Sequence, residues 1–337
     1  MDAIDTTLTG LELGPPTSHR RLTVYPLTGT TAGEPNYLLL DAALDAGLCE
    51  VTEVSEAGSV PELAFLNRAD KPVLLLDGEE LVGARQNRVL NITILIGAGQ
   101  KLVIPVSCVE QGRWAWRSRN FSSARRTMFA QARRDKMEQV SNSLHAFGGR
   151  YADQGAIWGT LYKRAAAFDV DSPTGAMADI YADVATSLDE IRRGFTSAAG
   201  QVGAVFALGN EVAGLELFDA PSTFETLLPK LVDSYAMDAL EQERAGDAAG
   251  EPAPEAVRDF IDQVRNAGIE TYPALGEGTD VRLRGPRLVG GALQVDDRIV
   301  HLSAFRMPGT ASDNGKPQGR PSRLASLASR RRGRDGR

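Results

Sequence analysis

Three apolar runs joined by short polar segments occupy residues 73–109, and they restrict the possible folds more than any other feature of the chain. The runs read VLLL, VLNITILI and KLVIPVSCV, and the second is strongly β-branched. The segments between the runs are too short for helical crossovers, so neighbouring strands are expected to run antiparallel. We predict a hairpin that turns at Asp77-Gly78 and a further turn at Gly97–Gly99.

Similar β-rich patterns extend over residues 20–120, and the hydrophobic period becomes helical after residue 120. Further strands are predicted at 21–27, 48–54 and 113–119, with 60–67 as a strand or a turn and 37–46 as a strand followed by a short helix. Helices are predicted at 123–147, 156–168, 177–195 and 255–267, with another opened by a capping box at Ser222–Glu225. Strands are predicted again at 202–218 and 281–306.

Two segments of the C-terminal half are similar to each other. GAVFALGNEVAGLELF (203–218) aligns without gaps with GGALQVDDRIVHLSAF (290–305), and each is predicted to be a strand, a polar turn and a strand. The similarity reflects either the sequence pattern that hairpins in general share or a duplicated hairpin that places equivalent positions around one sheet system. Residues 73–83 form a looser third copy.

These elements predict the α+β class: an antiparallel β-rich N-terminal half, a central helical block, and C-terminal β-hairpins that pack back on the sheet. We expect one integrated domain over residues 20–307, made of a β-rich part (20–120), a helical part (121–200) and mixed hairpins and helices (201–307). Residues 1–19 are predicted to be flexible. Residues 308–337 are rich in Gly, Ser and Arg and are predicted to be a disordered basic tail.

Composition and charge limit the classes of partner. Apolar residues make up 42% and charged residues 24% of the chain, which is typical of globular proteins. No apolar run is long enough for a membrane helix, and the acidic N-terminus lacks the features of a signal peptide. With only two cysteines, this predicts a cytoplasmic protein that does not enter membranes. The net charge of −7 disfavours nucleic acid, except at the basic segment 113–136 and the basic tail.

Several reactive residue types gather between residues 77 and 119. Glu79, Glu80 and Glu110 could serve as general acids or bases or as magnesium ligands, and Glu79 and Glu80 could instead be residues of a solvated turn. Cys108 is either a nucleophile or a small apolar filler of a core strand. Because Glu110 follows Cys108 on the same face of a strand, we expect that strand end to open into a cleft. No spacing of Cys and His residues indicates a zinc site, and no residue is assigned as a metal ligand.

Polar and aromatic residues near these carboxylates suggest a ligand. Gln86-Asn87-Arg88 could read a base, ribose or phosphate, or could cap the backbone of a tight loop. The basic segment 113–136, with Trp114 and Trp116 as stacking faces, could hold RNA or a small phosphorylated molecule, or could be a solvated helix face beside two core tryptophans. The acidic remainder of the chain favours the small molecule over RNA.

At GEELVGARQNRVLN (78–91) followed by PVSCVEQGRW (105–114), the chain resembles a bacterial family named for its association with ADP-ribosylglycohydrolase and rhodanese/phosphatase-superfamily proteins. The resemblance continues in GLELF, LVDSYAMDAL and VHLSAF, and so covers about residues 20–307. The resemblance implies no established activity. The association of the family's genes with genes of those other proteins implies a role in handling NAD-derived or ADP-ribose-containing molecules. Carrying the family's motif over to this chain places ten residues in the candidate site: Glu79, Glu80, Gln86, Asn87, Arg88, Cys108, Glu110, Gln111, Arg113 and Trp114.

Three hypotheses for function follow. The first is binding or processing of an ADP-ribose-like nucleotide, with Glu80, Glu110 and Cys108 as catalytic candidates and the other site residues as ligand contacts. If the protein is an enzyme, we expect a hydrolase that uses paired carboxylates. The second is a non-catalytic module that senses such a ligand or docks a partner. The third is RNA binding through residues 113–136. The sequence specifies neither a cofactor nor an oligomeric state.

Overall fold

A computed structural model describes residues 3–29, 33–247 and 250–309 of the chain. Residues up to Met307 form one compact unit. The part that the structure describes contains eight helices and eighteen strands, and nearly all strand pairs are antiparallel. The predicted α+β class is confirmed, with strands in the N-terminal part, helices in the middle and hairpins near the C-terminal end. The predicted disordered tail lies, from residue 310 onward, outside the described residues.

The elements follow in this order. The helices are α1 (Ala3–Thr9), α2 (Leu40–Asp45), α3 (Ala130–Phe147), α4 (Gln154–Ala167), α5 (Met177–Asp183), α6 (Ala185–Arg193), α7 (Pro221–Arg244) and α8 (Pro254–Arg265). The first strands are β1 (Leu11–Leu13), β2 (Thr17–His19), β3 (Leu22–Gly29), β4 (Leu38–Leu39), β5 (Cys49–Glu53), β6 (Glu62–Asn67), β7 (Val73–Leu75), β8 (Glu79–Gly83) and β9 (Arg88–Leu90). The remaining strands are β10 (Ile94–Ile96), β11 (Lys101–Cys108), β12 (Phe121–Thr127), β13 (Gln201–Leu208), β14 (Glu211–Phe218), β15 (Gly268–Pro273), β16 (Thr279–Gly285), β17 (Leu288–Val295) and β18 (Arg298–Arg306).

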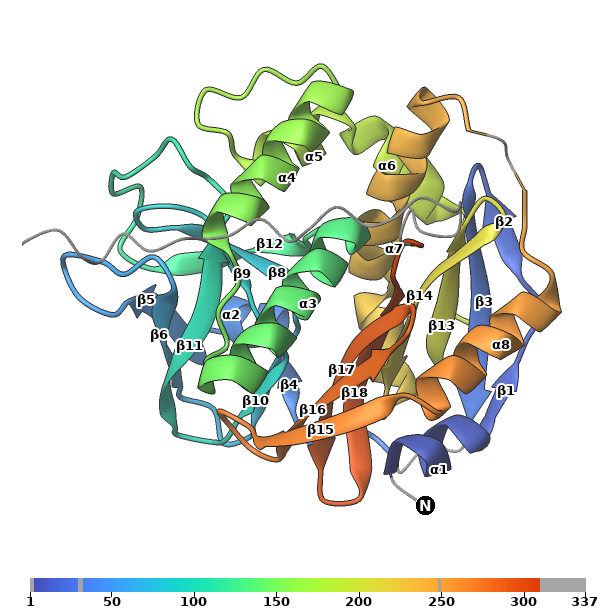
Figure 1. Ribbon diagram of the computed structural model, residues 1–337. Coiled ribbons are helices and arrows are strands. Elements are labelled where there is room, and N and C mark those ends of the chain that lie inside the picture. The colour runs from blue at the N-terminus through green and yellow to red at the C-terminus, as the bar shows by residue number, and fades with distance from the viewer. Residues whose placement is uncertain (1–2, 30–32, 248–249, 310–337) are drawn as a thin grey trace, which may run out of the picture. The chain divides into compact units, whose positions relative to one another are not determined.

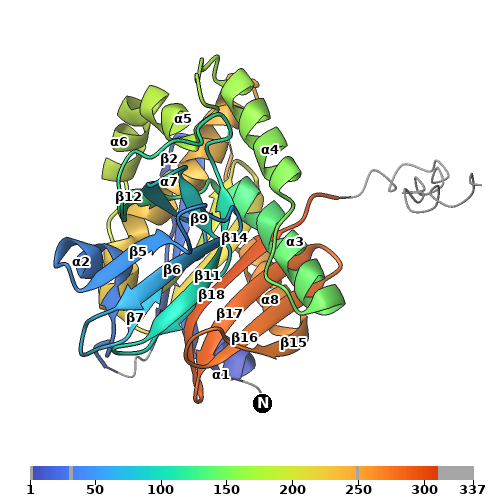
Figure 2. The same ribbon diagram turned by 90° about the vertical axis from the view of Figure 1, so that its left-hand side faces the viewer.

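The strands form one large sheet and two smaller ones. The large sheet has the order β1-β3-β13-β14-β18-β17-β16-β15, with β2 also paired to β3. The smaller sheets are β12-β8-β9-β11-β6-β5 and β10-β7-β4. Figure 2 shows the smaller sheets in blue to cyan beside the C-terminal strands of the large sheet in orange to red. The C-terminal hairpins therefore join the same sheet as the early strand β3.

Helices cover both faces of the large sheet, as Figure 1 shows. Helices α1 and α8 pack on one face, and α3 and α7 pack on the other. Helix α3 also joins the two β systems, because Met137 belongs to the core on the large sheet while Val140 and Leu144 belong to the core of the smaller sheets. Buried residues of α4, α5 and α6 extend the core that surrounds α7.

The similar segments of the C-terminal half are neighbouring hairpins related by a local two-fold axis. Strand β14 pairs with β18 so that Glu216 lies opposite Ser303, its equivalent in the alignment, while Leu215 lies opposite Ala304 and Leu217 opposite Leu302. The register shifts between β13 and β14 and between β17 and β18 fall at equivalent positions of the alignment. The sequence pattern that hairpins share does not require register shifts at equivalent positions. These shared shifts therefore support the interpretation as a duplicated hairpin.

The predicted hairpin at Asp77-Gly78 is wrong. Gly78 does make a turn, with φ of +83°, but β7 pairs with β10 and β4, whereas β8 pairs with β9 and β12. The chain thus passes from one sheet to another at this turn. The apolar run 89–96 passes back in the same way, because it splits into β9 and β10. The proposed third copy of the hairpin fails for this reason.

Other boundaries differ where tertiary contacts outweigh local pattern. Residues 113–119 form a loop instead of a strand, and the helix predicted from Ser123 begins at Ala130, after β12. The predicted helix 177–195 breaks at Val184 into α5 and α6. At the start of α7, Ser222 Oγ donates to Glu34 and forms no capping box. In place of the flexible lead-in expected before residue 20, the structure has α1, β1 and β2, because Ile4 and Leu8 are buried in the core under α8.

Candidate functional site

Two loops and three strand ends build the region that the motif residues occupy. Residues 84–87 connect β8 to β9, and residues 109–120 connect β11 to β12. Ala84 has a left-handed φ of +37°, and its backbone N donates to Ser118 Oγ at 3.0 Å. Its carbonyl accepts from the backbone N of Arg117 at 2.9 Å. The two loops are therefore tied together, which brings side chains from residues 80–88 beside those from residues 108–118.

Asn87 lies between the two candidate carboxylates. Its Nδ2 donates to Glu80 Oε1 at 3.2 Å, and its backbone N donates to Glu110 Oε2 at 3.0 Å. Its Oδ1 accepts from Arg113 Nη2 at 3.1 Å. One residue thus contacts both Glu80 and Glu110, which places the two carboxylates within a single polar cluster.

The two carboxylates have opposite pKa shifts. Burial raises the pKa of Glu80 to about 7, although Arg126 at 3.0 Å and the Asn87 amide oppose the rise. Burial also acts to raise the pKa of Glu110, but the hydrogen bonds from Arg113 and Asn87 outweigh it and lower the pKa. Opposite shifts of this kind are what a general acid and a general base require.

Arg113 binds the protein instead of presenting a free cation. Its Nε and Nη2 donate to Glu110 at 2.8 Å and 2.6 Å. Nη1 donates to the carbonyls of Ala84 and Ala115, and Nη2 also donates to the carbonyl of Gly83. Every guanidinium nitrogen is in use, so the expected role of Arg113 in holding phosphate has no free donor to support it.

Gln86, Arg88 and Cys108 form a buried group next to Glu110. Gln86 Nε2 donates to the Glu110 carbonyl at 3.0 Å, and its Oε1 accepts from Arg88 Nη1 at 3.2 Å and Cys108 Sγ at 3.3 Å. Burial raises the pKa of Cys108, which disfavours the thiolate that a nucleophile needs. Burial lowers the pKa of Arg88, whose Nε and Nη2 have no hydrogen-bond partner among the described residues.

One candidate residue, Glu79, lies apart from this cluster, and two lie at its border. The Gln111 carbonyl accepts from Gln86 Nε2 at 3.3 Å, and the ring centre of Trp114 lies 5.9 Å from the Arg88 guanidinium. Glu79 accepts from Lys230 Nζ at 2.5 Å and from the backbone N of Leu76 at 2.9 Å, so it belongs to a buried ion pair with α7. Gln111 is exposed and lines a separate cavity of about 290 Å³ beside α4 and α5. Trp114 is half-exposed, and the Arg85 guanidinium lies 5.4 Å from its ring centre.

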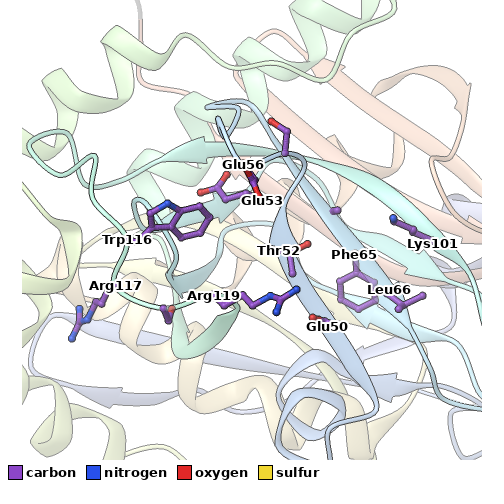
Figure 3. A pocket seen from close by; sticks show the side chains of 13 residues that line it. Glu50, Thr52, Glu53, Glu56, Phe65, Leu66, Lys101, Trp116, Arg117 and Arg119 are labelled. Atoms are coloured by element: carbon purple, nitrogen blue, oxygen red, sulfur yellow. The ribbon is translucent and has the colours of Figure 1, made fainter.

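A larger cavity of about 890 Å³ opens between β5, β6 and the loop after β11. The side chains around it are shown in Figure 3, where Trp116 points toward Glu53 and Glu56 while Arg119 reaches toward Thr52 and Glu50. The lining residues are Glu50, Thr52, Glu53, Ser55, Glu56, Ala64, Phe65, Leu66, Lys101, Trp116, Arg117, Ser118 and Arg119. Neither Glu80 nor Glu110 lines this cavity.

Charged side chains and the exposed ring of Trp116 distinguish this cavity. Within the part of the chain that the structure describes, the side chains of Lys101, Arg117 and Arg119 form no ion pair or hydrogen bond. Trp116 is 50% exposed, and the Arg85 guanidinium lies 4.7 Å from its ring centre. The motif pointed to the neighbouring cluster and missed Glu53. The available signal was the alternation of β5, which places this carboxylate on the buried face of the strand.

The basic segment 113–136 does not form one surface. Arg126 contacts Glu80, and Arg125 pairs with Asp45 at 2.6 Å. Arg133 and Lys136 are fully buried against Glu216 and Asp77. Because most of its cations are held in separate ion pairs, with Arg117 and Arg119 as exceptions within the described part of the chain, the RNA hypothesis loses the basic face that it required.

No group of three or more His, Cys, Asp or Glu side chains within residues 3–29, 33–247 and 250–309 is arranged to hold a metal ion. Among the helices of those same residues, none combines the length and the apolar character needed to cross a membrane.

Comparison with known proteins gives one match. The model of the ARG and Rhodanese-Phosphatase-superfamily-associated Protein domain matches residues 10–305. No curated protein and no solved structure matches the chain. The matched residues include the two motifs on which the resemblance was based and the elements around both cavities. The chain therefore belongs to the family of the ARG and Rhodanese-Phosphatase-superfamily-associated Protein domain.

Proposed function

We propose that this protein binds ADP-ribose or a related NAD-derived nucleotide in the 890 Å³ cavity beside Trp116. The observation that carries the proposal is the combination of a half-exposed tryptophan with unpaired basic side chains in one concave site. Pockets for small ligands commonly have volumes of about 300–1,000 Å³. The association recorded in the family's name supports the choice of an ADP-ribose-type ligand.

Each part of the cavity suits one part of a nucleotide. The Arg85 guanidinium lies 4.7 Å from the centre of the Trp116 ring. The part of this half-exposed ring that Arg85 leaves uncovered can stack on a base. Arg119 and Lys101 can pair with phosphate oxygens without breaking an ion pair in the described structure. The apolar side chains of Phe65 and Leu66 form another part of the wall.

Isothermal titration calorimetry with ADP-ribose, NAD and ADP tests the proposal. Loss of stacking costs about 1–3 kcal/mol per base, so Trp116→Ala should weaken binding by roughly 5- to 150-fold. Arg119→Gln should weaken binding of phosphorylated ligands and leave free adenosine less affected.

Two matched controls remove an exposed aromatic ring or an exposed arginine elsewhere. Phe147→Ala changes the end of α3, and Arg258→Gln changes the surface of α8. Both should bind like wild type. If none of the ligands binds the wild type, or if Trp116→Ala binds as tightly as Phe147→Ala, the proposal is wrong, and the absence of any ligand would favour the partner-docking module.

Hydrolysis of a nucleotide at the Asn87 cluster, outside that cavity, is a second candidate, favoured by the contact of Glu80 and Glu110 with the same asparagine and by their opposite pKa shifts. Glu110 would take a proton from water, and the hydroxide would form a bond to the anomeric carbon while the glycosidic bond from that carbon to the adenine base breaks. The electron pair of that bond would pass to the base, which Glu80 would protonate. Chromatography of ADP-ribose and NAD incubated with the protein tests it. Turnover by wild type that is abolished in Glu110→Gln would support hydrolysis. Tight binding without turnover would contradict hydrolysis and favour the hypothesis of a non-catalytic module.

A further inference from the structure

Glu53 is a buried carboxylate in the wall of the cavity, and one of its oxygens has no partner. It ends β5, where alternation places it on the same inward face as Cys49 and Val51. Only 7% of the residue is exposed. Its Oε1 accepts a long hydrogen bond of 3.4 Å from the backbone N of Arg85, whereas Oε2 has no hydrogen-bond partner among the described residues. A buried oxygen without a hydrogen-bond donor is unfavourable, so this site favours a ligand that can donate a hydrogen bond to Oε2.

The space next to Glu53 is narrow. The turn between β5 and β6 closes over the carboxylate at Gly58, which has a left-handed φ of +76°. A Cβ atom on Gly58 would lie 3.4 Å from Glu53 Oε2 and 3.3 Å from Trp114. A slim donor such as a hydroxyl group fits this setting better than a bulky one. Figure 3 shows Glu53 on the side of the cavity toward which Trp116 points.

The chemistry of a carboxylate selects the part of the ligand that it contacts. An ionised carboxylate accepts hydrogen bonds and donates none, so it attracts hydroxyl groups and repels phosphate. Phosphates would instead lie toward Lys101 and Arg119, two cations of the same cavity that have no ion-pair partner among the described residues. A nucleotide whose base stacks on Trp116 then has its ribose between the base and the phosphates, where its hydroxyls can donate to Glu53.

We infer that Glu53 recognises the vicinal hydroxyl groups of ribose, so that the ligand is a ribonucleotide with a free 2′-hydroxyl. The inference rests on the proposed function and narrows it to one class of nucleotide. Sites built to hydrogen-bond a ligand hydroxyl discriminate strongly against the analogue that lacks it, because the protein's polar group is then left unpaired.

Calorimetry with ADP and 2′-deoxyADP as probes tests the inference on the whole chain. We expect wild type to bind ADP at least about tenfold more tightly than 2′-deoxyADP, and Glu53→Gln to reduce that ratio to about threefold or less. Glu225→Gln, on the exposed surface of α7, should keep the wild-type ratio. Melting curves of each variant establish that it is folded.

The outcomes separate the two proposals. Equal binding of ADP and 2′-deoxyADP by wild type would overturn the ribose assignment while nucleotide binding stands, and this result does not depend on any variant. A Glu53→Gln protein that keeps the full preference would also overturn it. Binding of neither probe by wild type, together with no binding of ADP-ribose, would refute the proposed function itself.

Discussion

Replacing Glu80 with glutamine should change how the stability of the protein depends on pH. Glu80 is fully buried, and burial raises its pKa from 4.5 to about 7. Between these two pH values the folded protein holds a proton that the unfolded chain has released. The free energy of unfolding therefore falls as pH rises through this window. A glutamine at this position cannot titrate and removes this contribution.

The pKa shift of Glu80 sets the size of the effect. At about 1.4 kcal/mol per pKa unit, the shift of Glu80 lowers the stability of wild type by about 3 kcal/mol once the pH is well above 7. Most of this loss, about 2.5 kcal/mol, should develop between about pH 5 and about pH 8. Other groups titrate in both proteins, so the difference between wild type and Glu80→Gln isolates Glu80.

Urea denaturation followed by tryptophan fluorescence measures this difference. Unfolding free energies are determined for wild type, Glu80→Gln and the surface control Glu225→Gln at about pH 5, 6, 7 and 8. The gap between wild type and Glu80→Gln should change by about 2.5 kcal/mol in favour of the variant across the series, and the control should follow wild type. Parallel curves for wild type and Glu80→Gln would refute the assignment of Glu80 as a buried acid that is half-protonated near neutral pH.

The buried ion pair between α3 and the large sheet gives the remaining predictions. Glu216→Gln leaves the fully buried guanidinium of Arg133 without the carboxylate that it contacts at 2.6 Å, so urea denaturation should show a loss of about 3–5 kcal/mol. Burial acts to raise the pKa of Glu216, but Arg133 and His301 outweigh it, so the pKa is lowered overall. The contribution of this ion pair to the free energy of unfolding is therefore present above the ordinary pKa of glutamate and is lost as the pH falls below it. The double variant Arg133→Met/Glu216→Leu should recover most of the loss because no unpaired charge remains, and a double variant as unstable as the single one would contradict this account. Arg258→Gln, on an exposed pair, should change stability by less than about 1 kcal/mol.

Local sequence predicted the class of fold and many of its elements, but not how the strands pair. The pattern of residues 37–46 indicated a strand and then a short helix, and the structure has β4 and α2 there. The alignment of residues 203–218 with 290–305 predicted two hairpins and left open whether they are a duplication, which the shared register shifts in the structure support. At Asp77-Gly78 the same kind of evidence failed. A turn signal states that the chain reverses locally, whereas the strand partner is decided by which distant apolar faces become buried together.

The sequence alone determined that a polar motif lies among antiparallel strands, and the motif was sufficient to recognise the family. Only the tertiary structure decided what each side chain does. The guanidinium of Arg113 donates all its hydrogen bonds within the protein, including those to Glu110 and to backbone carbonyls, and Glu79 pairs with Lys230 of α7. The cavity with Trp116 and Glu53 forms because the loop after β11 lies across strands that are distant in the chain. Ion pairs and cavities depend on such long-range juxtaposition, and residue spacing along a chain does not encode it locally.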